Sequence, residues 1–249
     1  IIVGSALLNA LLLNGKKIEE IKIVASGAGA AALSCLDLLC ALGAKKENII
    51  VADSRGLITT KREGLDDSKK RYMQDIEATQ LADVIGGADM FLGLSAAGIL
   101  TKAMVKEMAE NPIIFALANP DPEILPEHAH EVRPDVIMAT GRSDYPNQVN
   151  NALCFPYIFR GALDVGATTV NEEMKIACVH AIARMAHIEA DASTYGEKSA
   201  SFGRDYLIPR PLDQRLILEI APAVAQAAMD SGVASRPIQD FSAYRQRLS

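Results

Sequence analysis

Three small residues follow an apolar run with the spacing G-x-G-x-x-A: Gly27, Gly29 and Ala32. The run from Ile21 to Ala25 predicts a buried strand, and the alanine-rich stretch that begins near Ala30 predicts a helix. In a dinucleotide-binding turn, the first glycine allows the sharp turn, the second lets the pyrophosphate approach the backbone, and the third small residue lets helix and strand pack closely. The free N–H groups at the helix start attract the phosphates. We therefore expect a pyrophosphate site formed by Gly27, Ala28, Gly29, Ala30, Ala31 and Ala32, although ordinary turns also carry such glycines.

An acidic residue ends the next predicted strand, which covers residues 48–52. This residue, Asp53, falls roughly 20 positions beyond the glycine turn, where an acid binds the adenosine ribose hydroxyls. It is alternatively an ordinary turn residue. We assign Ser54 and Arg55 to the same adenosine subsite. Residues 59–70 are polar and are either a solvated loop and helix start or part of a site in which Arg55, Lys61 or Arg62 meets the 2′-phosphate of NADP. Asp53 would repel that phosphate unless its side chain turned away.

Strands and helices alternate along the first two-thirds of the chain, and several strands end in small or polar residues. Apolar strands are predicted over residues 89–95, 113–118 and 136–139, and they end in Ser95, Asn119 and Thr140. This alternation predicts an α/β fold, a Rossmann-type doubly wound parallel sheet with ligands at the carboxyl ends of its strands. We therefore expect Ser95 and Asn119 at the ligand face.

Helical patterns dominate the two ends of the chain. Residues 2–14 are apolar and helical in pattern, and a capping box, Thr169-x-x-Glu172, predicts a helix through Ala186. Residues 191–209 are polar and loop-like, and Pro211 opens a further helical region that Pro222 should kink or divide. We predict a helix over residues 1–16 that continues from a missing N-terminal domain, a dinucleotide-binding domain over 17–165, and C-terminal helices over 166–249 that pack on it.

The composition argues against several classes of protein. A net charge of −6, an aromatic content of 5% and the absence of tryptophan speak against nucleic acid or an anionic membrane as a partner. The apolar segment at residues 1–13 is too short to span a bilayer. Because the four cysteines form no C-x-x-C pair, we expect buried, reduced thiols and a cytoplasmic protein. The chain begins without methionine inside a helical pattern, so we expect a fragment that lacks an upstream part.

A polar segment follows the strand that ends at Ala139. It brings an arginine, a serine, an aspartate and four side-chain amides to the expected ligand face: Arg142, Ser143, Asp144, Asn147, Gln148, Asn150 and Asn151. Asparagine amides donate to carboxylates or carboxamides without adding charge. A structural loop with turn asparagines is the alternative, and spacing alone names no substrate.

Four motifs resemble the malic enzyme family: A-L-A-N-P at 116–120, A-T-G-R-S-D at 139–144, P-N-Q-V-N-N at 146–151 and F-P at 155–156. The resemblance covers nearly the whole chain, as the dinucleotide-binding domain of that family. The stretch R-P-I-Q-D-F-S-A-Y-R at 236–245 resembles bacterial hybrid malic enzymes, in which a phosphotransacetylase-like domain follows.

The resemblance implies oxidative decarboxylation of malate to pyruvate and CO₂, with NADP or NAD and with Mg²⁺ or Mn²⁺, in a homo-oligomer. It places Asp53 beside the adenosine ribose, Asn119 and Asn150 near the nicotinamide, and Asn119 and Asn151 near malate. The catalytic lysine and tyrosine and the acidic metal ligands of the family lie upstream, so we expect no catalytic residue and no metal ligand in this chain. The alternatives are a dinucleotide-binding module without catalysis, used for sensing or assembly, and the Rossmann domain of another hydroxy- or amino-acid dehydrogenase.

Overall fold

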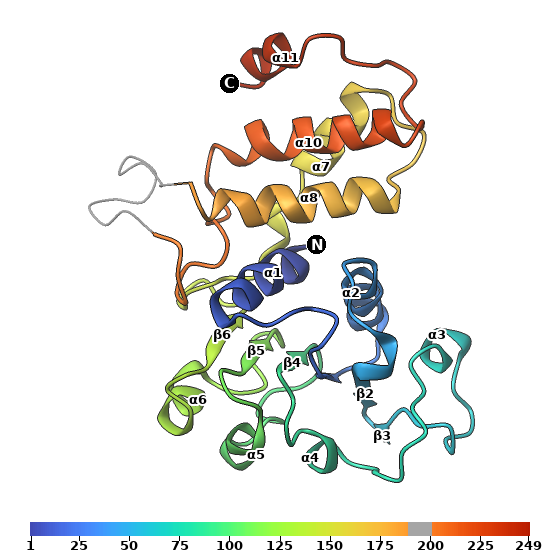
Figure 1. The fold of residues 1–249 in the computed structure, drawn as a ribbon, viewed down its shortest axis with the longest axis vertical. Coiled ribbons are helices and arrows are strands. Elements are labelled where there is room, and N and C mark those ends of the chain that lie inside the picture. Colours follow the sequence, from blue (N-terminus) through green and yellow to red (C-terminus); the bar gives the residue numbers. More distant parts are fainter. Residues whose placement is uncertain (189–200) are drawn as a thin grey trace. The chain divides into compact units, whose positions relative to one another are not determined.

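The computed structural model describes residues 1–188 and 201–249 (Figure 1). These residues form two compact units. The sheet unit is Ala10–Val149, and the helical unit is Ile1–Asn9 together with Asn150–Ser249. The domain boundaries that we predicted, 17–165 and 166–249, stay a prediction.

The sheet unit contains a six-stranded sheet in the order β3-β2-β1-β4-β5-β6. Its strands are β1 (Ile23–Ser26), β2 (Ile49–Asp53), β3 (Gly56–Leu57), β4 (Met90–Gly93), β5 (Ile113–Ala116) and β6 (Ile137–Thr140). Five strands run parallel to one another, as the alternation predicted. The short β3 is antiparallel to β2, because the turn between them is far too short for the crossover of about a dozen residues that a parallel pair needs.

Helices cover both faces of this sheet (Figure 1). One face carries α2 (Ala30–Ala41), and the other carries α4 (Leu81–Val84), α5 (Lys102–Glu107) and α6 (Pro126–Val132). Buried side chains such as Phe91 and Ile114 from the strands and Val105 from α5 form one core cluster. Because both faces are covered, the parallel strands are almost wholly buried and appear in the sequence as unbroken apolar runs. The expected doubly wound fold is confirmed.

The helical unit is built from the first half of α1 (Ile2–Asn14), the 3₁₀ turn η2 (Asn151–Leu153), α7 (Tyr157–Asp164), α8 (Glu172–Met185), α10 (Leu216–Asp230) and α11 (Phe241–Leu248). α1 is tied to α8 by two buried polar side chains. The Ser5 hydroxyl donates to the carbonyl of Val179 at 3.0 Å, and the Asn9 amide donates to the carbonyl of Ala183 at 2.9 Å.

The predicted cap of α8 was wrong. α8 is capped by Asn171, whose side chain accepts the N–H of Met174 at 3.1 Å, and not by Thr169. We predicted that Pro222 would kink or divide the last long helix, and α10 runs through Pro222 as one undivided helix. A proline leaves the carbonyl four residues earlier without its helical donor. Here that carbonyl belongs to Leu218, and the Arg245 guanidinium of α11 donates to it instead.

All four cysteines are free thiols. The prediction of burial holds for Cys154 and Cys178, whose sulfur atoms lie 3.4 Å apart, whereas Cys35 and Cys40 of α2 are partly exposed.

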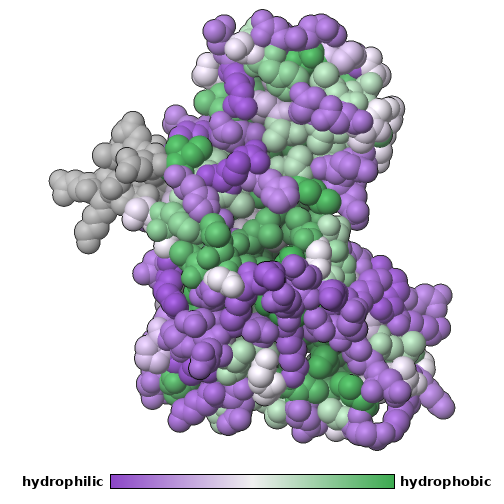
Figure 2. All heavy atoms as spheres, in the orientation of Figure 1, coloured by the Kyte–Doolittle hydropathy of each residue, from purple (hydrophilic) through white to green (hydrophobic). Residues whose placement is uncertain are grey.

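Apolar side chains gather at the surface over α1 (Figure 2), where Leu12 is 63% exposed. Within residues 1–188 and 201–249, no helix combines the length and the apolar character needed to cross a bilayer.

Candidate functional site

The glycine turn lies between β1 and α2, at the carboxyl end of the central strand. Gly27 has φ +111°, and a Cβ at this position would lie 2.4 Å from the carbonyl oxygen of Leu94. Its N–H donates to the carbonyl of Ala52 at 2.8 Å. Gly27 is therefore required by the fold itself, because the turn must pass directly over the end of β4.

Gly29 is a glycine for a different reason. It is the N-cap residue of α2, with φ −82° and ψ 178°, a backbone conformation open to any residue. A Cβ here would meet no atom within 4 Å. Gly29, Ala30 and Ala31 are exposed, while Ala32 is only 2% exposed and packs closely, as we predicted for the third small residue. The first N–H groups of α2 thus face open space and offer an anion site at the positive end of the helix dipole.

Asp53 lies at the end of β2, where we expected it, but its carboxylate is already surrounded by donors. Arg62 binds both oxygens, at 2.9 and 3.0 Å, Lys69 donates to Oδ2 at 2.9 Å, and the backbone N–H of Arg55 donates to Oδ1 at 2.9 Å. A carboxylate offers about four lone-pair sites, so these four donors occupy it. Burial alone would raise the pKa of Asp53, but the hydrogen bonds from Arg62 and Lys69 outweigh burial and hold the pKa well below its usual range.

The basic residues near Asp53 differ in their availability. The Arg62 guanidinium also donates to the carbonyl of Gly56 at 2.9 Å, so it is fixed inside the turn. Lys61 pairs with Glu77 at the surface. Arg55 is exposed, and its side chain makes no hydrogen bond or ion pair with residues 1–188 or 201–249. Lys69, which we did not single out from the sequence, is a partner of Asp53.

The ends of β4 and β5 carry the next two predicted residues. The Ser95 hydroxyl lies 2.8 Å from the hydroxyl of Ser26 at the end of β1. Asn119 is exposed in the loop after β5, at the same edge of the sheet. A residue that sequence reasoning missed, the fully buried Glu123, accepts the N–H of Ser95 at 2.8 Å and the N–H of Ala118 at 3.0 Å.

The loop after β6 is partly structural, which was the alternative to a ligand-binding role for its polar side chains. Asn147 is 6% exposed with φ 54°, and its amide donates to the carbonyl of Met138 at 2.9 Å. Arg142 is paired with Asp144 through its Nε at 2.9 Å. These residues therefore shape the loop, and Ser143 is exposed beside them.

Asn150 and Asn151 belong to the helical unit. Asn150 caps η2, since its side chain accepts the N–H of Ala152 at 3.0 Å. Asn151 is the first residue of this 3₁₀ turn, and the next helix, α7, starts at Tyr157. The Asn151 side chain is exposed and makes no hydrogen bond with the part of the chain that the structure describes. Its amide is thus available to a ligand.

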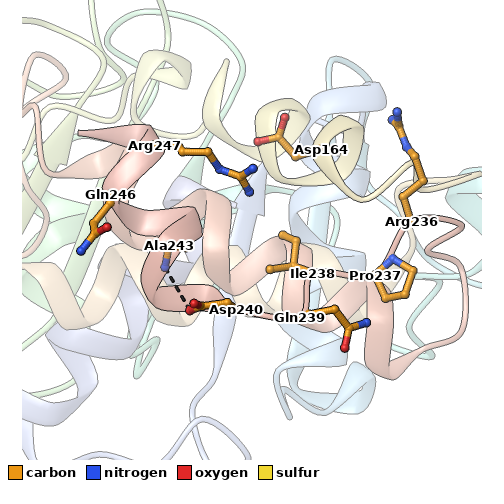
Figure 3. A pocket seen from close by; sticks show the side chains of 9 residues that line it. All are labelled: Asp164, Arg236, Pro237, Ile238, Gln239, Asp240, Ala243, Gln246 and Arg247. Carbon is orange, nitrogen blue, oxygen red and sulfur yellow. Dashed lines mark hydrogen bonds between the residues drawn. The ribbon is translucent and has the colours of Figure 1, made fainter.

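A hollow of about 580 Å³ lies elsewhere, at the start of α11 in the helical unit (Figure 3). Its charged lining includes Arg236 and Arg247, which stand apart on two sides of it (Figure 3). Asp164, at its rim, is already bound by the Tyr244 hydroxyl at 2.6 Å and by Arg160 at 2.7 Å. None of the predicted site residues lines this hollow, so it is separate from the candidate site.

Within residues 1–188 and 201–249, no group of three or more histidine, cysteine, aspartate or glutamate side chains is arranged to hold a metal ion.

The chain is similar to known proteins over its whole length. The profile of the family described as "Malic enzyme, NAD binding domain" matches residues 1–196. The chain is 60% identical over 254 residues to the NADP-dependent malic enzyme of Haemophilus influenzae, covering all of this chain and 34% of that protein. It is 61% identical over 253 residues to the NAD-dependent malic enzyme of Rhizobium meliloti, again covering all of this chain and 33% of that protein. The chain thus spans about a third of the length of these relatives.

Solved structures agree with this similarity. The structure of malic enzyme from Pyrococcus horikoshii superposes with a TM-score of 0.86 at 36% identity, covering 99% of this chain and 57% of that one. The structure of Entamoeba histolytica malic enzyme gives a TM-score of 0.86 at 32% identity, covering 99% and 50%.

Proposed function

This chain belongs to the malic enzyme family, and from that we propose that it is the dinucleotide-binding part of an enzyme that oxidatively decarboxylates malate to pyruvate and CO₂. The observation that carries the proposal is the start of α2. Gly29 leaves open space in front of free N–H groups, although neither its backbone conformation nor its neighbours require a glycine. A ligand that approaches the backbone closely explains why this position has no side chain.

In this proposal the residues of the chain bind and orient the two reactants. The N–H groups at residues 29–32 hold the pyrophosphate, and the exposed amide of Asn119 lies at the edge of the sheet for the nicotinamide side or the malate carboxylate. Asn150 shapes the turn from which Asn151 offers its amide to malate. When bound, the cofactor accepts a hydride from the carbon that carries the malate hydroxyl.

We further propose that the chain prefers NADP to NAD. Asp53 is occupied by four donors and cannot also accept the two ribose hydroxyls of NAD. Its pairing with Arg62 and Lys69 leaves one net positive charge at the end of β2, and Arg55 adds another that has no partner among the described residues. The 2′-phosphate of NADP complements this charge, and the repulsion that Asp53 alone would cause is cancelled.

By resemblance, we propose that a lysine base, a tyrosine acid and acidic ligands for Mg²⁺ or Mn²⁺ belong to an upstream catalytic domain. We also propose, by the same resemblance, a phosphotransacetylase-like domain downstream, a homo-oligomer and a cytoplasmic location.

Binding and turnover measurements test this function. Titration of the chain with NADPH and NADH, followed by the change in dinucleotide fluorescence, should show tighter binding of NADPH. Arg55→Ala should weaken NADPH about tenfold or more, the value of one hydrogen bond to a charged group, and leave NADH unchanged. The chain alone should not reduce NADP⁺ in the presence of malate and Mg²⁺. A chain that binds neither dinucleotide, or that oxidises malate by itself, would contradict the proposal.

A further inference from the structure

Glu123 is a fully buried acid in the loop between β5 and α6, and the proposed chemistry does not account for it. Its Oε1 accepts the backbone N–H of Ser95 at 2.8 Å and lies 3.4 Å from the hydroxyl of the same residue. Its Oε2 accepts the backbone N–H of Ala118 at 3.0 Å. Because Ser95 follows β4 and Ala118 follows β5, one side chain joins the carboxyl ends of two neighbouring strands.

Gly93, the last residue of β4, provides the space for this carboxylate. A Cβ at Gly93 would lie 2.3 Å from Cδ of Glu123 and 2.6 Å from Oε2, which is far inside van der Waals contact. The backbone of Gly93 is that of an ordinary strand residue, so its only special requirement is the missing side chain.

The hydrogen bonds to Glu123 hold the two loops firmly. A buried carboxylate is costly unless hydrogen bonds satisfy it, so movement of either loop would leave a buried oxygen without a donor. The loop after β4 has two further attachments to the same segment. The N–H of Gly98 donates to the carbonyl of Pro122 at 3.2 Å, and the N–H of Leu100 donates to the carbonyl of Glu123 at 3.1 Å.

The strand order shows which part of the cofactor these loops face. In a sheet of this order, the dinucleotide crosses the carboxyl ends where the order reverses, between β1 and β4. The glycine turn and Asp53 belong to the half formed by β1 and β2, which takes the adenosine side. The loops after β4 and β5 belong to the other half, which takes the nicotinamide side.

We propose that Glu123 is a positioning residue for the nicotinamide half of the cofactor, an inference that rests on the proposed function. It fixes Ser95 and the backbone before Asn119 in the conformation that receives this half. Glu123 lies beneath the two loops and does not touch the cofactor. In Glu123→Gln an amide NH₂ replaces one oxygen and faces an N–H donor, so one of the loops loses its attachment.

Two ligands separate this role from a general loss of stability. NADPH spans both halves of the site, whereas adenosine 2′,5′-bisphosphate carries the adenosine half alone. The variants are Glu123→Gln and Gly93→Ala, which displaces the carboxylate without changing it. The matched control is Ile114→Val, which weakens the fully buried core of β5 without altering either loop. Affinities are measured by fluorescence and calorimetry at a temperature where the circular-dichroism spectrum of each variant matches that of the parent.

We expect both variants to bind NADPH about tenfold more weakly than the parent, or worse, since at least one charge-assisted hydrogen bond is lost. Their affinity for adenosine 2′,5′-bisphosphate should stay within about twofold of the parent, and Ile114→Val should bind both ligands normally. Unchanged binding of NADPH, or an equal loss for both ligands, would overturn the proposal. So would a failure of both variants to fold, because Glu123 would then serve folding alone. If the parent itself binds neither ligand, it is the proposed function that fails.

Discussion

Replacement of Gly29 by valine tests the dinucleotide site at a position where the fold itself does not require a glycine. Gly29 has φ −82°, and a Cβ there would meet no protein atom within 4 Å. A valine side chain therefore fits the folded chain. It would project into the space before the N–H groups of α2, where we place the pyrophosphate.

Gly29→Val should have a small effect on the stability of the fold and a large effect on dinucleotide binding. Valine is a poorer N-cap residue than glycine by about 0.5–1 kcal/mol, which lowers Tm by roughly 2–4 °C in a chain of this size. Each hydrogen bond to a charged phosphate is worth about 1.5–3 kcal/mol. If the branched side chain displaces the phosphates from two N–H groups, the affinity should fall at least about 100-fold.

The matched control is Gly27→Ala in the same turn. Gly27 has φ +111°, and its Cβ would lie 2.4 Å from the carbonyl oxygen of Leu94. Alanine here strains the backbone by about 1–2 kcal/mol before the clash is counted, so Tm should fall more than in Gly29→Val. The two neighbouring glycines thus separate a loss of binding from a loss of folding.

The assay combines fluorescence titration with NADPH and thermal melting followed by circular dichroism. Gly29→Ala should give an intermediate affinity, because its single methyl group occupies less of the space. Binding of NADPH by Gly29→Val as tight as by the parent, with no more than the expected fall in Tm, would contradict this prediction. In that case the glycine turn would not be the pyrophosphate site.

In the proposed full-length enzyme, Asn151→Ala should lower kcat/KM for malate roughly ten- to a hundredfold with an unchanged Tm, since the Asn151 side chain caps no helix among the described residues. An unchanged kcat/KM would remove Asn151 from the substrate site. The depressed pKa of Asp53 means that its pairing stabilises the fold above the unfolded-state pKa of about 3.9 and that this stability is lost as the pH falls through the folded-state pKa. Arg62→Met should therefore lower Tm at pH 7 and flatten the change of Tm between pH 2 and 5, and parallel profiles would contradict the pairing. A hydrogen bond from Cys178 lowers the pKa of the Cys154 thiol, so mild oxidation with diamide should link these two residues with loss of two hydrogens; a peptide map without this link would show that the pair is inert.

The sequence predicts the sheet well because its strands are buried on both faces. Such strands appear as short apolar runs that local pattern alone can find, and each ends in the small or polar residue that marks the ligand edge. The sequence pattern does not show that Gly27 and Gly29 have different roles. Two glycines in one motif look alike, and only the neighbouring carbonyl of Leu94 distinguishes them.

Contacts between residues distant in the sequence could not be predicted. Glu123 accepts the backbone N–H of Ser95, and Asp53 accepts a hydrogen bond from the Lys69 side chain. The Arg245 side chain donates to the carbonyl of Leu218 in α10. No local sequence pattern predicts such partners. The error at the start of α8 arose because Thr169 and Asn171 can both cap a helix, and the path of the chain decides which of them does.

Both edges of the sheet are closed against a further strand. On one side the sheet ends in β3, which is two residues long. On the other side the Asn147 amide donates to the carbonyl of Met138 at 2.9 Å, and the N–H of Val149 donates to the carbonyl of Thr140 at 2.8 Å. An open strand edge is a template on which another chain can pair and aggregate. The loop at 146–149 therefore occupies two carbonyl groups of β6 that a strand of another chain could otherwise use.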